Sequence, residues 1–141
     1  MIERHHDWRE RLGRAIAEAS SRQFQWGSFD CALHVCDCLK AITGVDPAEK
    51  IRGTYSDAAG AAAIHGDSLQ EFIARHAAEL ELPEISPTMA QRGDVVYVDN
   101  GTPQGALGIV GLDARFAVCV SDRGLVMIRI HRWKRAWKVG R

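Results

Sequence analysis

The sequence predicts an α+β fold in which helices come first and an antiparallel sheet follows. Up to residue 82, apolar side chains recur at the spacing of amphipathic helices. From residue 92 onward, short runs of β-branched residues alternate with turn signals at residues 99–101 and 121–124. Because helices and strands are grouped and do not alternate, the pattern indicates an α+β protein with N-terminal helices packed on a small antiparallel sheet or partial barrel.

Four helices are expected in the first part of the chain, over residues 3–22, 31–43, 56–64 and 67–82. The second of these is the most apolar. Asp30 and Gly44 flank it, and these residue types are favoured just before and just after a helix. A break at Gly66 separates the last two helices.

Five strands are expected in the second part, over residues 94–98, 107–112, 115–120, 125–130 and 136–139. The predicted core combines apolar side chains from the helices and the strands: Trp26, Leu33, Val35, Leu39, Val96, Val98, Ile109 and Val126.

The composition is that of one globular domain over residues 1–141, mainly helical over 1–82 and stranded over 92–139. Apolar residues make up 46 % and charged residues 26 %, which argues against disorder.

The 18 basic residues balance the 18 acidic ones, so we expect no nucleic-acid partner. No apolar run approaches the roughly 20 residues of a membrane span, and the first residues lack a secretion signal. We therefore expect synthesis in the cytoplasm.

Neither a metal nor a cofactor is expected. Four cysteines in 141 residues are too few for a disulfide framework, so free thiols are expected. The chain has no Cys-x-x-Cys pair, and Cys36 and Cys38 point to different sides of one predicted helix. It also lacks a glycine-rich phosphate loop.

Charge is unevenly distributed along the chain. Residues 67–100 hold seven acids and two bases, whereas residues 129–141 hold six bases and no acid. The basic block is either a face for a partner or a segment that packs near the acidic helix and neutralises it. A partner face would include Arg132, Trp133, Arg135 and Trp137, because indole rings anchor interfaces well.

Cys31 is the strongest candidate for reactive chemistry. It follows the capping residue Asp30, so it begins a helix, where free backbone N–H groups and the helix dipole favour a thiolate. The alternative is that Cys31 is a small buried apolar residue, as free cysteines often are. His34 lies one turn further along the same helix and is either a partner of Cys31 or an ordinary packed side chain.

The order of these motifs resembles the NlpC-type, papain-fold cysteine peptidases. Residues 29–33 look like the start of that family's nucleophile helix, and residues 91–96 look like its first core strand. Residues 106–111 look like its next strand, and residues 132–139 like its closing stretch. The resemblance covers residues 24–139 and is greatest to small NlpC-like proteins encoded in the tail-gene clusters of phages, prophages and gene transfer agents.

The resemblance implies a Cys nucleophile, a His base on the second core strand and a polar residue on the next strand that orients the His. Cys31 matches the first position, but Ala106 stands at the His position and Val118 near the third. Neither can replace the missing group, and loss of a general base costs about 10²–10⁴-fold in rate. His34 and His131 are the best substitutes among the remaining histidines.

Two functions are therefore expected as alternatives. The favoured one is a structural or assembly component of a phage-like tail tip, which binds other tail-tip proteins through a scaffold that has lost its catalytic pair. The other is an active endopeptidase that cleaves the peptide stems of bacterial peptidoglycan through Cys31. A third and weaker alternative is a module that binds peptidoglycan without cleaving it.

Overall fold

The computed structural model describes residues 2–140 and contains four α-helices followed by a six-stranded sheet. The helices are α1 (Trp8–Ala19), α2 (Cys31–Thr43), α3 (Ala58–His65) and α4 (Leu69–Glu79). The strands are β1 (Glu84–Ile85), β2 (Val95–Val98), β3 (Ala106–Val110), β4 (Phe116–Ser121), β5 (Gly124–Arg129) and β6 (Trp133–Trp137). Two short 3-10 helices, η1 (Pro87–Met89) and η2 (Ile130–Arg132), complete the fold. The α+β class predicted from the sequence is confirmed.

The sheet is antiparallel throughout and open, with the strand order β1-β6-β2-β3-β4-β5. Strands β2 to β5 form a meander, as expected. The last strand does not extend that meander but returns to pair with β2 on its other side. The two-residue strand β1, which the sequence did not predict, pairs with β6 and forms the far edge.

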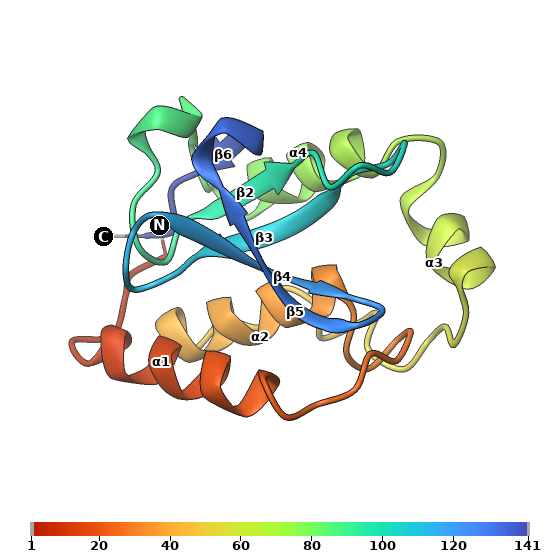
Figure 1. The fold of residues 1–141 in the computed structure, drawn as a ribbon, viewed down its shortest axis with the longest axis horizontal. Coiled ribbons are helices and arrows are strands. Elements are labelled where there is room, and N and C mark those ends of the chain that lie inside the picture. Colours follow the sequence, from red (N-terminus) through yellow and green to blue (C-terminus); the bar gives the residue numbers. More distant parts are fainter. Residues whose placement is uncertain (1, 141) are drawn as a thin grey trace.

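The sheet is strongly curled because β5 and β6 lie far apart in strand order but are joined only by η2. Figure 1 shows β5 crossing in front of the sheet and leading directly into β6. The indole N–H of Trp133 on β6 donates to the carbonyl of Ile128 on β5, with 3.0 Å between nitrogen and oxygen. This bond ties the two strands together without closing the sheet into a barrel.

Helices α1 and α2 lie side by side along one face of the sheet, and α2 contacts β3 and β4 directly (Figure 1). The core between them holds side chains from α2 and from one face of the strands, among them Leu39, Ile42, Ile109 and Val118. A second cluster occupies the inside of the curl. It includes Val96, Val98, Ala106, Cys119 and Trp133.

Six of the eight predicted core residues are buried: Leu33, Val35, Leu39, Val96, Val98 and Ile109. Val126 is only partly buried. The prediction for Trp26 is wrong, because its side chain is 37 % exposed and meets Phe24 edge to face at the surface. The loop that carries Trp26 turns the indole outward, and the fully buried aromatic ring of this segment is Phe29 instead.

The helix boundaries follow from local capping. Asp30 caps α2 and Gly44 ends it, as predicted. Ser68 caps α4 through its hydroxyl oxygen, which accepts from the Glu71 N–H at 3.1 Å. The first helix is shorter than the predicted 3–22, because Arg4 leaves the helix direction and extends toward Asp94 at the start of β2.

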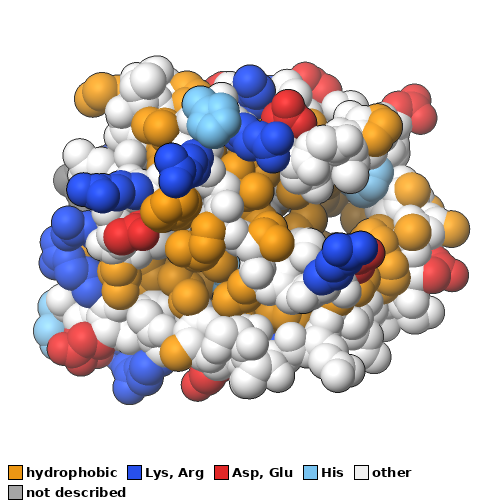
Figure 2. Space-filling model, in the orientation of Figure 1, with side chains coloured by type: hydrophobic (Ala, Val, Ile, Leu, Met, Phe, Trp, Pro, Cys, Tyr) orange, Lys and Arg blue, Asp and Glu red, His pale blue; other side chains and the backbone are white. Residues whose placement is uncertain are grey.

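Within residues 2–140 no helix is long and apolar enough to cross a membrane. In the view of Figure 2, apolar side chains spread across the centre of the face, while many Lys and Arg side chains gather on the side where Figure 1 places the chain ends. Arg141, the last residue of the basic block, lies outside the described residues.

Candidate functional site around Cys31

Asp30 fixes the start of α2 and thereby the place of Cys31. One carboxylate oxygen of Asp30 accepts from the N–H of Leu33 at 3.0 Å, and the other accepts from the N–H of Gly27 at 3.1 Å. The phenol of Tyr55 donates to the second oxygen as well. Asp30 is only 2 % exposed, so this buried carboxylate has its hydrogen-bonding partners supplied from three segments.

The loop before Asp30 is tightly closed. Gly27 has a φ of 79°, and a Cβ on it would lie 1.8 Å from the carbonyl oxygen of Tyr55. The carbonyl of Gly27 also accepts from the N–H of Gly53 at 2.9 Å. Only glycine fits here, and the contact fixes the 46–55 connection against the start of α2.

Cys31 is partly buried where α2 meets the sheet, and it contacts both core clusters. Burial raises the pKa of the thiol above its usual value, although the backbone amides of Leu107 and Ala32 favour the anion. The carboxylate of Asp30 adds to the rise. The surroundings of Cys31 therefore hold the neutral thiol and not a reactive thiolate.

Ala106 lies at the start of β3 and belongs to the cluster against which Cys31 packs. Val118 does not share that position. It pairs with Ile109, and both side chains belong to the cluster on the α2 side of the sheet. Val118 and Ala106 thus lie on opposite faces of the sheet, so Val118 does not face a side chain at position 106.

The residue of β4 that lies on the Ala106 face is Cys119. Side chains alternate between faces along a strand, so a shift of one residue exchanges Val118 for Cys119. Cys119 is 1 % exposed, and burial, followed by the charge of Cys31, raises the pKa of its thiol to about 12. The sequence analysis does not identify Cys119 or Tyr55 as parts of the site. The alternation of side chains between the two faces along residues 116–121 is a signal that could have indicated Cys119.

No histidine among the described residues makes a hydrogen bond or ion pair with Cys31. His34 is buried and turns toward Cys38, with 3.7 Å between Nε2 and Sγ. Its ring stacks edge to face on Phe29. Burial, followed by the charge of Arg22, lowers the pKa of His34 to about 4. His34 is therefore neutral at pH 7 and engaged elsewhere.

The other histidines lie on different elements. His131 is exposed in η2, His65 contacts the carbonyl of Gly66, and His76 pairs with Glu79 on α4. His5 lies near Gly44 at the far end of α2 from Cys31. The geometry thus gives no support to the expectation that His34 or His131 replaces the missing base.

The predicted partner face at the C-terminal end is corrected in part. Trp133 and Trp137 are 4 % and 2 % exposed, so both indoles belong to the core and offer no surface to a partner. Arg135 is bound to Glu84 through two contacts of 2.9 and 2.6 Å and also lies 3.8 Å from Glu71 on α4. Arg132 alone is exposed.

The acidic and basic parts of the chain therefore neutralise one another at Arg135, which is the second of the two alternatives raised by the charge pattern.

The described residues contain no group of three or more His, Cys, Asp or Glu side chains placed to hold a metal ion. The site as a whole consists of a capped helix start, a neutral thiol and a cluster of small apolar side chains.

Comparison with known proteins places the chain in a family. The model of the family described as a domain of unknown function (DUF6950) matches residues 3–139, so the chain belongs to that family. No curated protein matches the sequence.

Proposed function

We propose that this member of the DUF6950 family is a non-catalytic structural or assembly component of a phage-like tail tip, built on a degenerate NlpC-like, papain-like scaffold. It is made in the cytoplasm of a bacterial host and joins the tail through other tail-tip proteins. The observation that carries the proposal is that Cys31 packs against the apolar cluster that contains Ala106, the residue that the resemblance puts at the position of the general base.

The chemistry of the site supports a loss of activity. A cysteine peptidase needs a thiolate, a base that takes and returns a proton, and a group that orients the base. Burial raises the pKa of Cys31, and no imidazole or carboxylate of residues 2–140 forms a hydrogen bond with its sulfur. Ala106 and its neighbours Val98 and Trp133 belong to one apolar cluster, and none of their side chains can serve as a base.

The arrangement of elements supports the scaffold assignment. A cysteine begins an apolar helix, and that helix packs on an antiparallel sheet whose strand β3 begins beside the cysteine. This is the arrangement that the resemblance to NlpC-type peptidases predicts. A retained fold carries no guarantee of a retained activity, so function rests on the site and not on the scaffold.

The second candidate is a cysteine endopeptidase acting on peptidoglycan stem peptides. It is favoured by the amides of Leu107 and Ala32, which point at the sulfur of Cys31 and would stabilise negative charge there. The endopeptidase requires a reactive thiolate at Cys31, whereas the assembly role does not.

Thiol reactivity and hydrolysis separate the candidates in one experiment. The full chain is treated with iodoacetamide over a range of pH, alkylation of Cys31 is followed by mass spectrometry, and release of peptides from purified peptidoglycan is measured in parallel. We expect slow alkylation with an apparent pKa above the usual value of about 8.5, and no release beyond that of a Cys31→Ser control. A thiolate that forms below that value, together with release that Cys31→Ser abolishes, would establish the enzyme.

The assembly role is tested in the native host. We expect the chain in purified tail particles by mass spectrometry, and defective tail tips in electron micrographs when its gene is deleted. Complementation with Cys31→Ser should restore normal tips, because assembly does not use the thiol. Intact tails without the chain, or its absence from purified particles, would exclude the role.

A further inference from the structure

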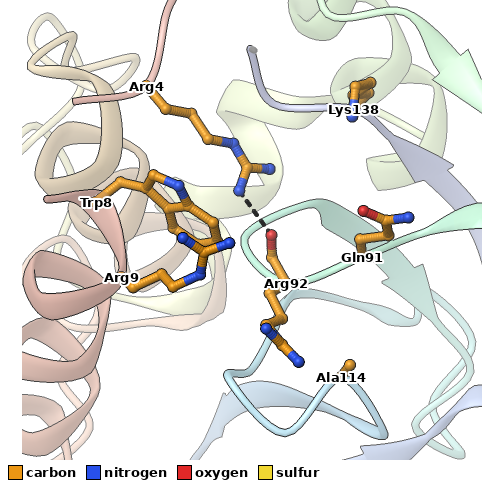
Figure 3. Close-up of a pocket in the computed structure, with 7 residues that line it drawn as sticks. All are labelled: Arg4, Trp8, Arg9, Gln91, Arg92, Ala114 and Lys138. Atoms are coloured by element: carbon orange, nitrogen blue, oxygen red, sulfur yellow. Dashed lines mark hydrogen bonds between the residues drawn. The ribbon is translucent and has the colours of Figure 1, made fainter. Parts of the chain in front are cut away.

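A basic pocket lies at the opposite end of strands β2 and β3 from Cys31. It has a volume of about 480 Å³ and is lined by Arg4, Trp8, Arg9, Arg92 and Lys138, with Gln91 and Ala114 completing the wall. Figure 3 shows these residues around the pocket, on the N-terminal segment and the start of α1, the loop before β2, the β3–β4 connection and the C-terminal segment. The pocket thus forms only when four separate parts of the chain meet.

One of its four cations is structural. The guanidinium of Arg4 bonds to Asp94 at 2.9 Å, to the carbonyl of Arg92 at 2.8 Å and to the carbonyl of Val139 at 2.6 Å. Asp94 is fully buried and accepts in addition from the N–H groups of Gln91 and Val139. The carboxylate of Asp94 therefore makes all of its contacts inside the wall of the pocket, and its negative charge offsets the positive charge of Arg4.

The other three cations differ from Arg4 in their surroundings. Arg9, Arg92 and Lys138 are exposed, and none forms an ion pair with an acid within residues 2–140. Burial lowers the pKa of Arg4, and the neighbouring charge of Arg9 lowers it further against the pull of Asp94. The pocket therefore holds like charges that repel one another, and an anion would relieve that repulsion.

The number of cations and the size of the pocket indicate which anion fits. Arg9, Arg92 and Lys138 come from three different segments and offer three separate positive groups, which a chain with several negative groups can match. The volume also lies in the range of pockets that accept a ligand larger than an ion, about 300–1,000 Å³. Guanidinium groups form planar, two-pronged contacts with carboxylates.

A nucleic acid fits less well. The guanidinium carbons of Arg4 and Arg9 lie 4.2 and 4.7 Å from the centre of the Trp8 ring, so the aromatic surface is already engaged by cations and is not free to stack on a base. The chain as a whole has a formal net charge of zero, which provides no long-range attraction for a polyanion.

We propose that this pocket binds an acidic peptide segment of a partner protein, with Arg9, Arg92 and Lys138 each donating hydrogen bonds to a carboxylate. The proposal goes beyond the assembly role, because such a segment would be recognised whether or not the partner belongs to a tail. Failure of either proposal leaves the other standing.

The test uses the full chain and a fluorescein-labelled hexaglutamate peptide, with binding followed by fluorescence anisotropy at fixed ionic strength. Hexaglutamine with the same label is the neutral control. The double variant Arg9→Gln/Arg92→Gln removes two pocket cations but leaves the structural Arg4 intact. The double variant Arg75→Gln/Arg123→Gln changes the net charge equally at exposed positions on α4 and in the β4–β5 turn. Circular dichroism and Tm verify that both variants fold.

We expect hexaglutamate to bind, hexaglutamine not to bind, and the pocket variant to lose about tenfold or more in affinity, which is what removing charge-assisted contacts costs. The control variant should stay within about twofold of the parent chain. An equal loss in both variants, or no binding of hexaglutamate at millimolar concentration, would overturn the proposal. So would tighter binding of an oligothymidylate of equal charge, or displacement of the peptide by inorganic phosphate at matched ionic strength.

Discussion

The phenol of Tyr55 donates a hydrogen bond to the carboxylate of Asp30. The same carboxylate caps the helix that begins at Cys31. Tyr55 ends the irregular 46–55 connection, so a residue 25 positions away in sequence helps to hold the start of α2. Burial, and then the bond to Asp30, raise the pKa of Tyr55 above its usual value, which keeps the phenol protonated and able to donate. Hydrogen bonds from two segments thus hold the start of α2, and the thiol of Cys31 forms no hydrogen bond with an imidazole or carboxylate among residues 2–140.

The first prediction concerns this bond. Tyr55→Phe removes the hydroxyl and leaves the Asp30 carboxylate buried with only the N–H groups of Gly27 and Leu33. Because hydrogen bonds to charged groups contribute about 1.5–3 kcal/mol, we expect a loss of that size in the free energy of unfolding. Urea denaturation monitored by circular dichroism measures it.

Tyr97→Phe is the matched control. The phenol of Tyr97 donates to a neutral acceptor, the carbonyl of Gln104. A bond between neutral groups contributes only about 0.5–1.5 kcal/mol, so this variant should lose less stability than Tyr55→Phe. Equal losses, or a larger loss in Tyr97→Phe, would mean that the charge of Asp30 does not strengthen its bond with Tyr55.

Local signals explain why much of the fold could be predicted. The capping residues Asp30 and Gly44 lie next to the helix they bound, so both ends of α2 could be predicted correctly. The start of α1 depends instead on Arg4 reaching Asp94, a contact between residues 90 positions apart. Likewise β1 exists only because Glu84 and Ile85 pair with β6, and a two-residue segment carries no periodic pattern.

The candidate site likewise combines features that follow from the local sequence with features that depend on contacts between distant residues. The place of Cys31 follows from its neighbours in sequence, whereas the face on which Val118 or Cys119 lies depends on the pairing of Ile109 with Val118. Trp133 and Trp137 occur among basic residues, a pattern that is typical of surface anchors. They are buried because β6 is inserted between β1 and β2, which no local pattern indicates.

The second prediction tests the packing of the Ala106 face. A Cβ on Gly108 would lie 2.5 Å from Sγ of Cys119 and 3.2 Å from the carbonyl oxygen of Val118. Gly108→Ala therefore requires the strand or the thiol to move, and overpacking of this kind costs about 1–3 kcal/mol. The expected result is a corresponding fall in the free energy of unfolding, measured in urea.

A double-mutant cycle assigns that cost to the thiol. Cys119→Ala in the Gly108→Ala background should recover part of the loss, because it removes the nearest obstructing atom. Gly111→Ala serves as the control, since its nearest contact would be an ordinary 3.5 Å. If the cycle is additive, Cys119 is not what excludes a side chain at Gly108.

The third prediction concerns the ion pair between Arg4 and Asp94, whose side chains are 8 % and 1 % exposed. Arg4→Met leaves the Asp94 carboxylate buried without its cation, and breaking a buried pair from one side costs about 3–5 kcal/mol. We expect a loss of that order in urea denaturation, with a clearly smaller loss when the same change is made in an Asp94→Asn background.

Arg11→Met is the surface control for this pair. It breaks the bond between Arg11 and Asp7, whose side chains are 41 % and 25 % exposed, and solvent screens such pairs. Its effect on stability should be much smaller than that of Arg4→Met. Similar effects of the two substitutions would show that the burial of Asp94 adds nothing to the strength of its ion pair.

The last prediction is a pH dependence that originates at His34. Burial, followed by the charge of Arg22, lowers the pKa of His34 to about 4 in the folded chain, against about 6.5 when unfolded. As the pH falls, the unfolded chain therefore binds the proton first. The stabilisation is complete above about pH 7, is lost progressively between pH 6.5 and 4, and changes no further below pH 4. The total loss is about 3 kcal/mol.

Urea denaturation at a series of pH values measures this loss, and His34→Phe removes it because phenylalanine does not titrate. His131→Gln, which removes an exposed imidazole, is the control and should keep the pH dependence of the parent chain. NMR titration gives an independent reading, in which the His34 ring should not titrate until the pH approaches 4. A parent chain and a His34→Phe variant with the same pH dependence would show that folding does not change the pKa of His34, and the lowering attributed to burial would have to be abandoned.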